Sequence, residues 1–281
     1  MRHMSARPHP RTALVTGASS GIGEQFARDL AERGYALVLV ARRADRLGAL
    51  AAELADRFGT EAEVLPADLG APDGTAAVEE RLRADGTGGP DGTGGAAPVD
   101  LLVNNAGRGD GGAFAEQDPD DVEHMLDVNV RAVLRLARAV LPVQIARRER
   151  GERDRPMGII NVSSMAGEMT VNPGGSVYSA TKKFVTLWSE SVAVEAAPHD
   201  VHVTAVLPGF VRTDMTRAVQ EGGTPDAAFV PKERITRDAL RAWAAGRASV
   251  VPGAQYKVAD GLLRAIPRTL YKAVAGRRTV L

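Results

Sequence analysis

The stretch that decides the fold is TALVTGASSGIGEQFARDLAER, residues 12–33. Its first five residues are apolar or β-branched throughout, which is typical of a strand buried on both faces. Glycines follow at Gly17, Gly21 and Gly23, where a segment of helical period begins. Such glycines let the backbone approach a pyrophosphate, and the N–H groups at the helix start face its charge. Taken alone they could also form an ordinary tight turn.

Short apolar runs continue to alternate with segments of helical period, which predicts βαβ units and a parallel sheet. We expect strands at residues 12–16, 36–41, 62–67, 100–105, 158–164 and 201–208, and helices within 23–33, 44–57 and 120–148. Because these strands lack a strict polar alternation, both faces of the sheet should be covered. The expected class is α/β, a doubly wound parallel sheet (Rossmann fold) with helices on both faces.

The length of 281 residues favours one domain. We expect a disordered N-terminal extension over residues 1–10 and a single nucleotide-binding domain over residues 11–281. The stretch DGTGGPDGTGGAAP, residues 85–98, reads as a flexible surface loop because it is rich in glycine and poor in apolar residues. No function is assigned to it.

Composition excludes several classes of function. Acidic and basic side chains balance at 35 each, so no net field favours nucleic acid or anionic lipid as a partner. The absence of cysteine excludes disulfides, thiolate metal sites and a cysteine nucleophile. The apolar runs are too short for a signal peptide core or a membrane span, which predicts a cytoplasmic protein. No metal is expected, because metal-ligand spacing is absent among His3, His9, His124, His199 and His202.

The second expected strand ends in VARRADRL. An acidic residue at this position would bind the adenosine ribose hydroxyls of NAD, but the sequence has Arg42 and Arg43 instead. Two arginines can bind a 2′-phosphate, which favours NADP(H) as the cofactor. The alternative is a solvated helix start with no ligand.

The segment YSATK places Tyr178 and Lys182 four residues apart, on one face of a helix. A free phenol has a pKa near 10 and is a poor base at neutral pH. A neighbouring ammonium favours the phenolate, so we expect Lys182 to lower the pKa of Tyr178 and create an acid/base catalyst.

These motifs and several others, taken in order from Arg11 to about Gly253, resemble the short-chain dehydrogenase/reductase family. The glycine spacing TGxxxGxG, NNAG at residues 104–107, DVNV, NVSS, YSATK and PGFVRT at residues 208–213 carry the resemblance. It implies that the cofactor meets the residues Gly17, Ser19, Ser20, Gly21, Ile22, Gly23, Arg42, Arg43, Asp68, Leu69, Asn105, Ala106, Gly107, Tyr178, Lys182, Pro208, Gly209, Val211 and Thr213.

The resemblance also implies catalytic roles for Asn129, Ser164, Tyr178 and Lys182. Ser164 would hold the substrate oxygen beside Tyr178, and Lys182 would bind the nicotinamide ribose. Asn129 would shape its helix and anchor a water that links Lys182 to solvent. Ser163 competes for the serine role, but Ser164 directly precedes the short xxG of the family pattern. Each residue alone could be purely structural, and their order and spacing favour the catalytic reading.

Two further segments lie in the C-terminal part of the chain, and the resemblance implies a role for the first. Residues 213–236, mixed in composition and containing glycines and prolines, are expected to form a lid over the substrate. Residues 262–281 carry five basic and no acidic side chains, and a helix packed on its own domain or a sister subunit is favoured over a membrane-surface helix. A homodimer or homotetramer is implied by the family alone.

The sequence therefore predicts an NADP(H)-dependent oxidoreductase that transfers hydride between nicotinamide and a small ketone or alcohol, with Tyr178 as general acid/base. The glycine spacing and the length argue against a sugar-nucleotide epimerase. A catalytically silent NADP(H)-binding regulatory protein is the alternative. With only five lysines among 35 basic residues, the composition is typical of a GC-rich genome. This suggests the hypothesis of a ketoreductase that tailors natural products.

Overall fold

The computed structural model describes residues 11–87, 95–109, 111–169 and 171–265. The expected N-terminal extension (1–10), the centre of the glycine-rich loop (88–94) and most of the basic C-terminal stretch (266–281) lie outside the described residues. Within the described part, no helix is long and apolar enough to cross a membrane.

Among the described residues, seven parallel strands form one sheet in the order β3-β2-β1-β4-β5-β6-β7. Their bounds are β1 (Thr12–Thr16), β2 (Ala36–Ala41), β3 (Ala62–Pro66), β4 (Leu101–Asn104), β5 (Gly158–Val162), β6 (His202–Val206) and β7 (Ser249–Val250). The first six confirm the predicted strands to within two residues at each end. The two-residue β7 was not predicted, because so short a strand has no readable pattern.

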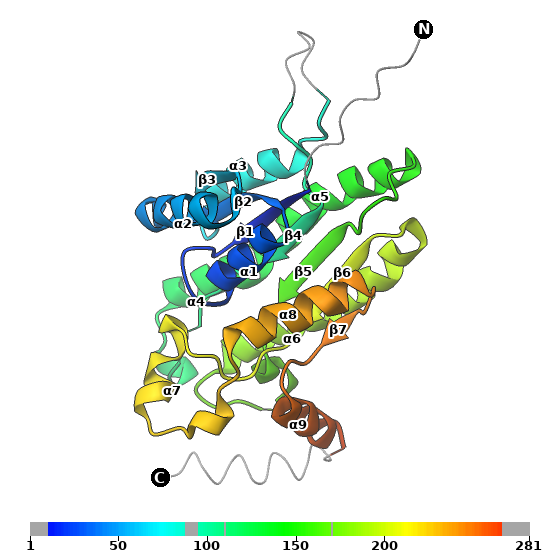
Figure 1. The fold of residues 1–281 in the computed structure, drawn as a ribbon. Helices are drawn as coiled ribbons and strands as arrows, with labels where there is room; N and C mark the ends of the chain where they lie inside the picture. The colour runs from blue at the N-terminus through cyan, green and yellow to red at the C-terminus, as the bar shows by residue number, and fades with distance from the viewer. Residues whose placement is uncertain (1–10, 88–94, 110, 170, 266–281) are drawn as a thin grey trace, which may run out of the picture.

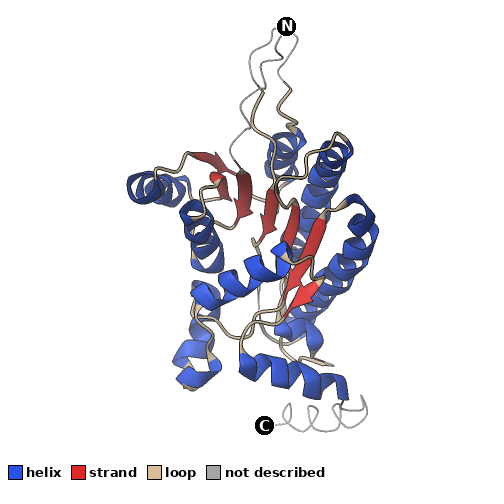
Figure 2. Cartoon of the chain, turned by 45° about the vertical axis from the view of Figure 1, so that its right-hand side comes forward, coloured by secondary structure: helices blue, strands red, loops and turns tan. Residues whose placement is uncertain are grey.

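Helices cover both faces of the sheet, as Figures 1 and 2 show. They are α1 (Gly21–Glu32), α2 (Ala44–Phe58), α3 (Pro72–Arg83), α4 (Pro119–Leu126), α5 (Ala132–Glu149), α6 (Ser176–Ala196), α7 (Arg217–Glu221), α8 (Lys232–Ala244) and α9 (Ala254–Ala265). On one face α1, α2 and α8 pack on Val15, Leu37 and Leu39. On the other, α3 and α5 pack on Leu14 and Val38. Successive strand residues thus enter opposite cores, which explains the unbroken apolar runs.

The predicted helix over residues 120–148 is interrupted. Between α4 and α5 the chain forms a π-helical turn, η2, over Asp127–Arg131. This turn contains the buried side chain of Asn129. Because π turns insert an extra residue into a helix, they rotate the side chains that follow and are frequent at functional sites.

The segment expected to form a lid, residues 213–236, has two parts in the structure. Residues 213–231 form short turns and α7, whereas residues 232–236 are the first turns of α8. Ile235 and Thr236 are fully buried, and Ile235 belongs to the core beside α1. That residues 213–231 form a lid stays a prediction, and we keep the name lid for these residues.

The order of the strands determines where a ligand site can form. The chain reverses its direction of winding between β1 and β4, which lie side by side although β2 and β3 separate them in sequence. In doubly wound sheets, a crevice for ligands opens at the carboxyl ends of the strands at this point. In Figure 1, α7 and the helix α9 lie at one end of the molecule.

Candidate active site

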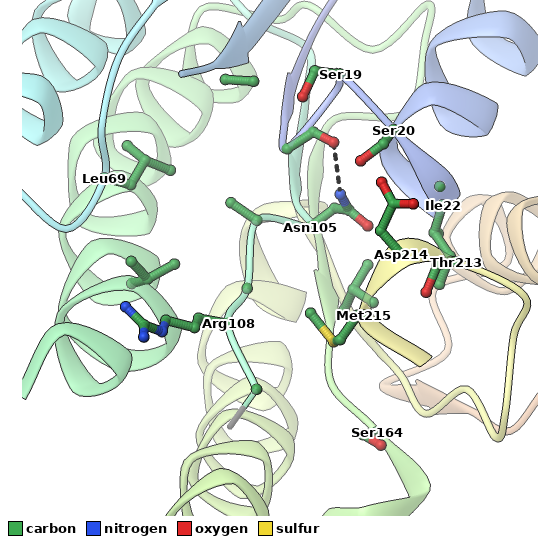
Figure 3. A pocket seen from close by; sticks show the side chains of 18 of the residues that line it. Ser19, Ser20, Ile22, Leu69, Asn105, Arg108, Ser164, Thr213, Asp214 and Met215 are labelled. Atoms are coloured by element: carbon green, nitrogen blue, oxygen red, sulfur yellow. Dashed lines mark hydrogen bonds between the residues drawn. The ribbon is translucent and has the colours of Figure 1, made fainter. Parts of the chain in front are cut away.

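A cavity of about 570 Å³ opens at the carboxyl ends of the strands. It brings together residues from the loops after β1, β2, β3, β4, β5 and β6 and from helix α6. All the sequence-predicted site residues line it except Gly23 and Asn129, which lie behind its wall. The structure thus collects side chains more than 190 residues apart in one place, as Figure 3 shows for part of the lining.

The glycine loop after β1 has no room for side chains at two positions. A Cβ on Gly23 would lie 2.3 Å from the carbonyl oxygen of Gly17, and a Cβ on Gly17 would lie 2.8 Å from Nδ2 of Asn105. The Asn105 amide donates to the carbonyl oxygen of Thr16 at 2.9 Å and points toward the loop (Figure 3). Gly23 is therefore a packing glycine, and the loop is a backbone cradle open to the cavity.

Arg43 extends from the end of β2 to this cradle. Its guanidinium donates to the hydroxyls of Ser19 at 3.0 Å and Ser20 at 3.1 Å. Arg42 is exposed and lines the same end of the cavity. Asp68 also lines the cavity, but its Oδ1 accepts from the N–H of Gly70 at 2.9 Å. The arginines provide a positive end at which a phosphate group can be bound.

Ser164 and Tyr178 meet at the other part of the cavity. Ser164 ends the extended stretch after β5, and its hydroxyl accepts from the N–H of Ala166 at 3.1 Å. A hydrogen bond between Ser164 and the phenol of Tyr178 opposes the effect of burial on the phenol. Ser163 is turned into the protein, where its hydroxyl donates to the carbonyl oxygen of Lys182 at 2.7 Å. The geometry favours Ser164 over Ser163 for contact with a substrate oxygen.

Lys182 is a buried base. Its side chain is 5% exposed, and Nζ donates to the carbonyl oxygen of Val162 at 3.0 Å. Nζ also lies 5.8 Å from the centroid of the Tyr178 ring. Burial lowers the pKa of Lys182 to about 8, because the ammonium is desolvated.

The expected lowering of the tyrosine pKa is not found. Burial raises the pKa of Tyr178 above its ordinary value, and the hydrogen bond with Ser164 opposes this only in part. The prediction was wrong because it counted the charge of Lys182 and left out desolvation, which penalises the phenolate. The phenol of Tyr178 therefore stays protonated at neutral pH.

Asn129 holds the framework of the site from behind the cavity wall. Its Oδ1 accepts from the N–H of Arg108 at 2.8 Å, and its Nδ2 donates to the carbonyl oxygen of Arg108 at 2.8 Å. The same Nδ2 lies 3.1 Å from the hydroxyl of Thr181 in α6. The π turn is thereby tied to the loop after β4 and to the helix that carries Tyr178 and Lys182.

The sequence analysis missed several residues of the lining. Gly109 lies two residues after the NNAG motif. A Cβ on Gly109 would lie 3.3 Å from the Tyr178 ring and 3.7 Å from the sulfur of Met215. Met215 comes from the lid and reaches the region between Asn105 and Ser164 (Figure 3). The others are Val40, Ala41, Ala67, Arg108, His124, Val128 and Val162, together with Asp214 and Thr216, which like Met215 lie in the segment 213–236 that was expected to form a lid. Ser163, which competed with Ser164 for the serine role, also lines the cavity. The signal in the sequence that could have identified these lining residues is that they lie next to the recognised motifs.

Comparison with known proteins agrees with this geometry. The sequence model of the short chain dehydrogenase family matches residues 11–223. A protein of Streptomyces virginiae named as a ketoacyl reductase of the monensin polyketide synthase is 38% identical over 214 residues, which cover 75% of each chain.

Solved structures are similar over nearly the whole chain. A short-chain dehydrogenase from Sphingobium yanoikuyae in complex with NADPH is 35% identical, with a TM-score of 0.76 over 91% of this chain and 94% of that one. A bulky-bulky ketone specific alcohol dehydrogenase from Comamonas testosteroni is 30% identical, with a TM-score of 0.72 over 92% of this chain and 95% of that one. Sequence, sheet order and site agree, and the chain belongs to the short-chain dehydrogenase/reductase family of oxidoreductases.

Proposed function

We propose that this protein is an NADP(H)-dependent carbonyl reductase or alcohol dehydrogenase in which Tyr178 is the general acid/base. The observation that carries the proposal is one cavity with two ends of different chemistry. One end holds the glycine cradle with Arg42 and Arg43, and the other holds Ser164, Tyr178 and Lys182. A dinucleotide that spans the cavity would bring its reactive ring to the hydroxyl end.

The residues present fit this cofactor. The cradle exists only because Gly17 and Gly23 carry no Cβ, and it leaves backbone N–H groups for a pyrophosphate. Arg42 and Arg43 would hold the 2′-phosphate, and Lys182 would hold the nicotinamide ribose. The loop of Pro208, Gly209, Val211 and Thr213 would face the nicotinamide, which supplies or accepts the hydride. The similar structure with bound NADPH supports this choice of cofactor.

In the direction of reduction, Tyr178 donates its proton to the oxygen of the carbonyl as the carbon receives hydride, and the product is an alcohol. The Ser164 hydroxyl donates a hydrogen bond to the same oxygen and stabilises the charge that develops there. The raised pKa of Tyr178 suits this direction, because the phenol stays protonated at neutral pH. Asn129 keeps the helix of Tyr178 in position, and the relay water that it would anchor stays a prediction.

The first test is the substitution Tyr178→Phe, which removes the transferable proton and leaves the ring. We expect kcat to fall by about a hundred- to ten-thousandfold on a panel of ketones, aldehydes, diketones and quinones. NADPH binding, measured by fluorescence titration, should change little. Binding without turnover in both proteins would instead favour the catalytically silent regulatory protein.

The cofactor preference is tested with Arg43→Asp. We expect the Kd of NADPH to rise by about ten- to a hundredfold, because a carboxylate repels the 2′-phosphate. The Kd of NADH should fall, since the carboxylate can accept from the ribose hydroxyls. Arg46→Asp is the control, because Arg46 is exposed in the first turn of α2, which begins directly after Arg43, and the substitution makes the same charge change. Equal effects in both variants would contradict a specific 2′-phosphate site.

We also propose, more narrowly, a ketoreductase that tailors a natural product. The resemblance to the protein of the monensin polyketide synthase supports this reading. The homodimer or homotetramer implied by the family and the cytoplasmic location stay predictions.

A further inference from the structure

The two ends of the lid meet at one place, which we call the neck: residues 208–212 and 226–230. The N–H of Val230 donates to the carbonyl oxygen of Phe210 at 2.8 Å. The rings of Phe210 and Phe229 lie 6.2 Å apart, and the guanidinium of Arg212 lies 4.3 Å from the Phe229 ring centroid. Arg212 also forms an ion pair with Asp226. The lid between these contacts is therefore a loop closed at its base.

Tyr256 of helix α9 is bonded to both sides of the neck through one oxygen atom. Its hydroxyl accepts from the N–H of Phe210 at 3.0 Å and donates to the carbonyl oxygen of Ala228 at 2.8 Å. These partners lie 46 and 28 residues before it in the sequence. One hydroxyl thus satisfies a donor from the loop after β6 and an acceptor from the end of the lid.

The ring of Tyr256 supports the same loop from outside the cavity. A Cβ on Gly209 would lie 2.0 Å from two carbons of the ring, so the ring lies directly against the backbone of Gly209. Tyr256 also packs against the cluster of Met165 and Leu207 below the site. It does not line the cavity, whereas its neighbours Pro208, Gly209 and Val211 do.

We propose that Tyr256 is a positioning residue for hydride transfer: it fixes the loop of residues 208–213 and the neck of the lid, and so sets the placement of the nicotinamide. This inference rests on the proposed function. Tyr256 lies in α9 and does not line the cavity. It would nevertheless control the nicotinamide end of the cofactor and leave the adenosine end unaffected. The adenosine end is bound by the loops after β1 and β2, which Tyr256 does not contact.

Tyr256→Phe isolates the role of the hydroxyl. The ring still covers Gly209, but the N–H of Phe210 and the carbonyl of Ala228 lose their common partner. Tyr35→Phe is the matched control, because Tyr35 is buried directly before β2, at the amino ends of the strands, whereas the neck follows the carboxyl end of β6. Both variants lose a single oxygen atom.

The experiment compares the wild type and both variants in three measurements. These are the Kd of adenosine 2′,5′-bisphosphate, the single-turnover rate of hydride transfer to the best carbonyl substrate of the panel, and the rate of tryptic cleavage after Arg217. Arg217 is an exposed lid residue. For Tyr256→Phe we expect an unchanged Kd of the bisphosphate, hydride transfer slower by about tenfold, and faster cleavage of the lid. Tyr35→Phe should match the wild type in all three.

Each alternative outcome has a distinct meaning. Unchanged hydride transfer in Tyr256→Phe, or an equal loss of bisphosphate affinity, would overturn the positioning role and leave the proposed function intact. Failure of the wild type to bind the bisphosphate or to transfer hydride would overturn the proposed function, and the positioning role with it.

Discussion

At the scale of single residues, the buried charge of Lys182 lowers the stability of the folded protein. An ammonium that is 5% exposed and has one carbonyl partner is poorly solvated, which is why its pKa falls to about 8. In the unfolded chain the same group has its ordinary pKa of 10.5. Because the unfolded chain holds the proton more tightly, the charge opposes folding at neutral pH.

We therefore expect Lys182→Met to abolish turnover and to raise the free energy of unfolding at pH 7 by about 1–2 kcal/mol. The shift corresponds to about 3 kcal/mol, of which the lost hydrogen bond to Val162 removes about 1 kcal/mol. The cost of the charge is complete below pH 8 and disappears as the pH rises toward 10.5. The stability difference between variant and wild type should shrink over this range in urea unfolding. A constant difference would contradict the lowered pKa.

At the scale of elements, the π turn η2 connects three parts of the site. Asn129 binds both backbone groups of Arg108 in the loop after β4 and reaches Thr181 in α6. Gly107 lies close to the same group, since a Cβ there would lie 3.4 Å from Oδ1 of Asn129 and 3.3 Å from Nζ of Lys182. The position of α6, which carries Tyr178 and Lys182, thus depends on one buried amide.

Asn129→Ala is expected to lower the free energy of unfolding by about 2–3 kcal/mol, because the partly buried N–H and carbonyl of Arg108 both lose their hydrogen bonds to the Asn129 amide. The value of kcat should fall with it, because Tyr178 and Lys182 lose their alignment. Val130→Ala, in the same turn, is the control for a loss of helical packing. Urea unfolding and steady-state kinetics check both effects. Equal losses in the two variants would mean that the amide has no special role.

At the scale of the whole molecule, the end of the sheet opposite the cavity is held by buried charges. Asp100, just before β4, accepts from the N–H of Thr12 at 2.9 Å and pairs with Arg147 of α5 at 2.7 Å. Their side chains are 1% and 3% exposed, and Arg155 lies 3.7 Å from the same carboxylate. This pairing joins β1, β4 and α5 far from the site.

We expect Arg147→Met to reduce the free energy of unfolding by about 3–5 kcal/mol, because the buried carboxylate of Asp100 loses its main partner. At temperatures where the variant is folded, kcat/KM should equal that of the wild type, since Arg147 does not line the cavity. Thermal unfolding and kinetics on one sample give both values. A large loss of kcat/KM in the folded variant would show that the two ends of the sheet are coupled.

Much of the fold and of the candidate site follows from local pattern. The apolar runs predict six of the seven strands in the described part of the chain, because a strand buried on both faces needs apolar side chains at nearly every position. The glycine loop, and the spacing of Tyr178 and Lys182 on one helix face, are short-range features that the backbone must satisfy wherever the chain folds.

Other properties arise only when distant segments meet. The interruption of the helix at Asn129, the raised pKa of Tyr178, the position of Met215 over the site and the bond of Tyr256 to Phe210 and Ala228 all depend on tertiary contacts. Desolvation and long-range hydrogen bonds are set by what packs around a group, and no window of neighbouring residues contains that information. The local pattern therefore identifies the chemical groups of the site, whereas packing determines their protonation and alignment.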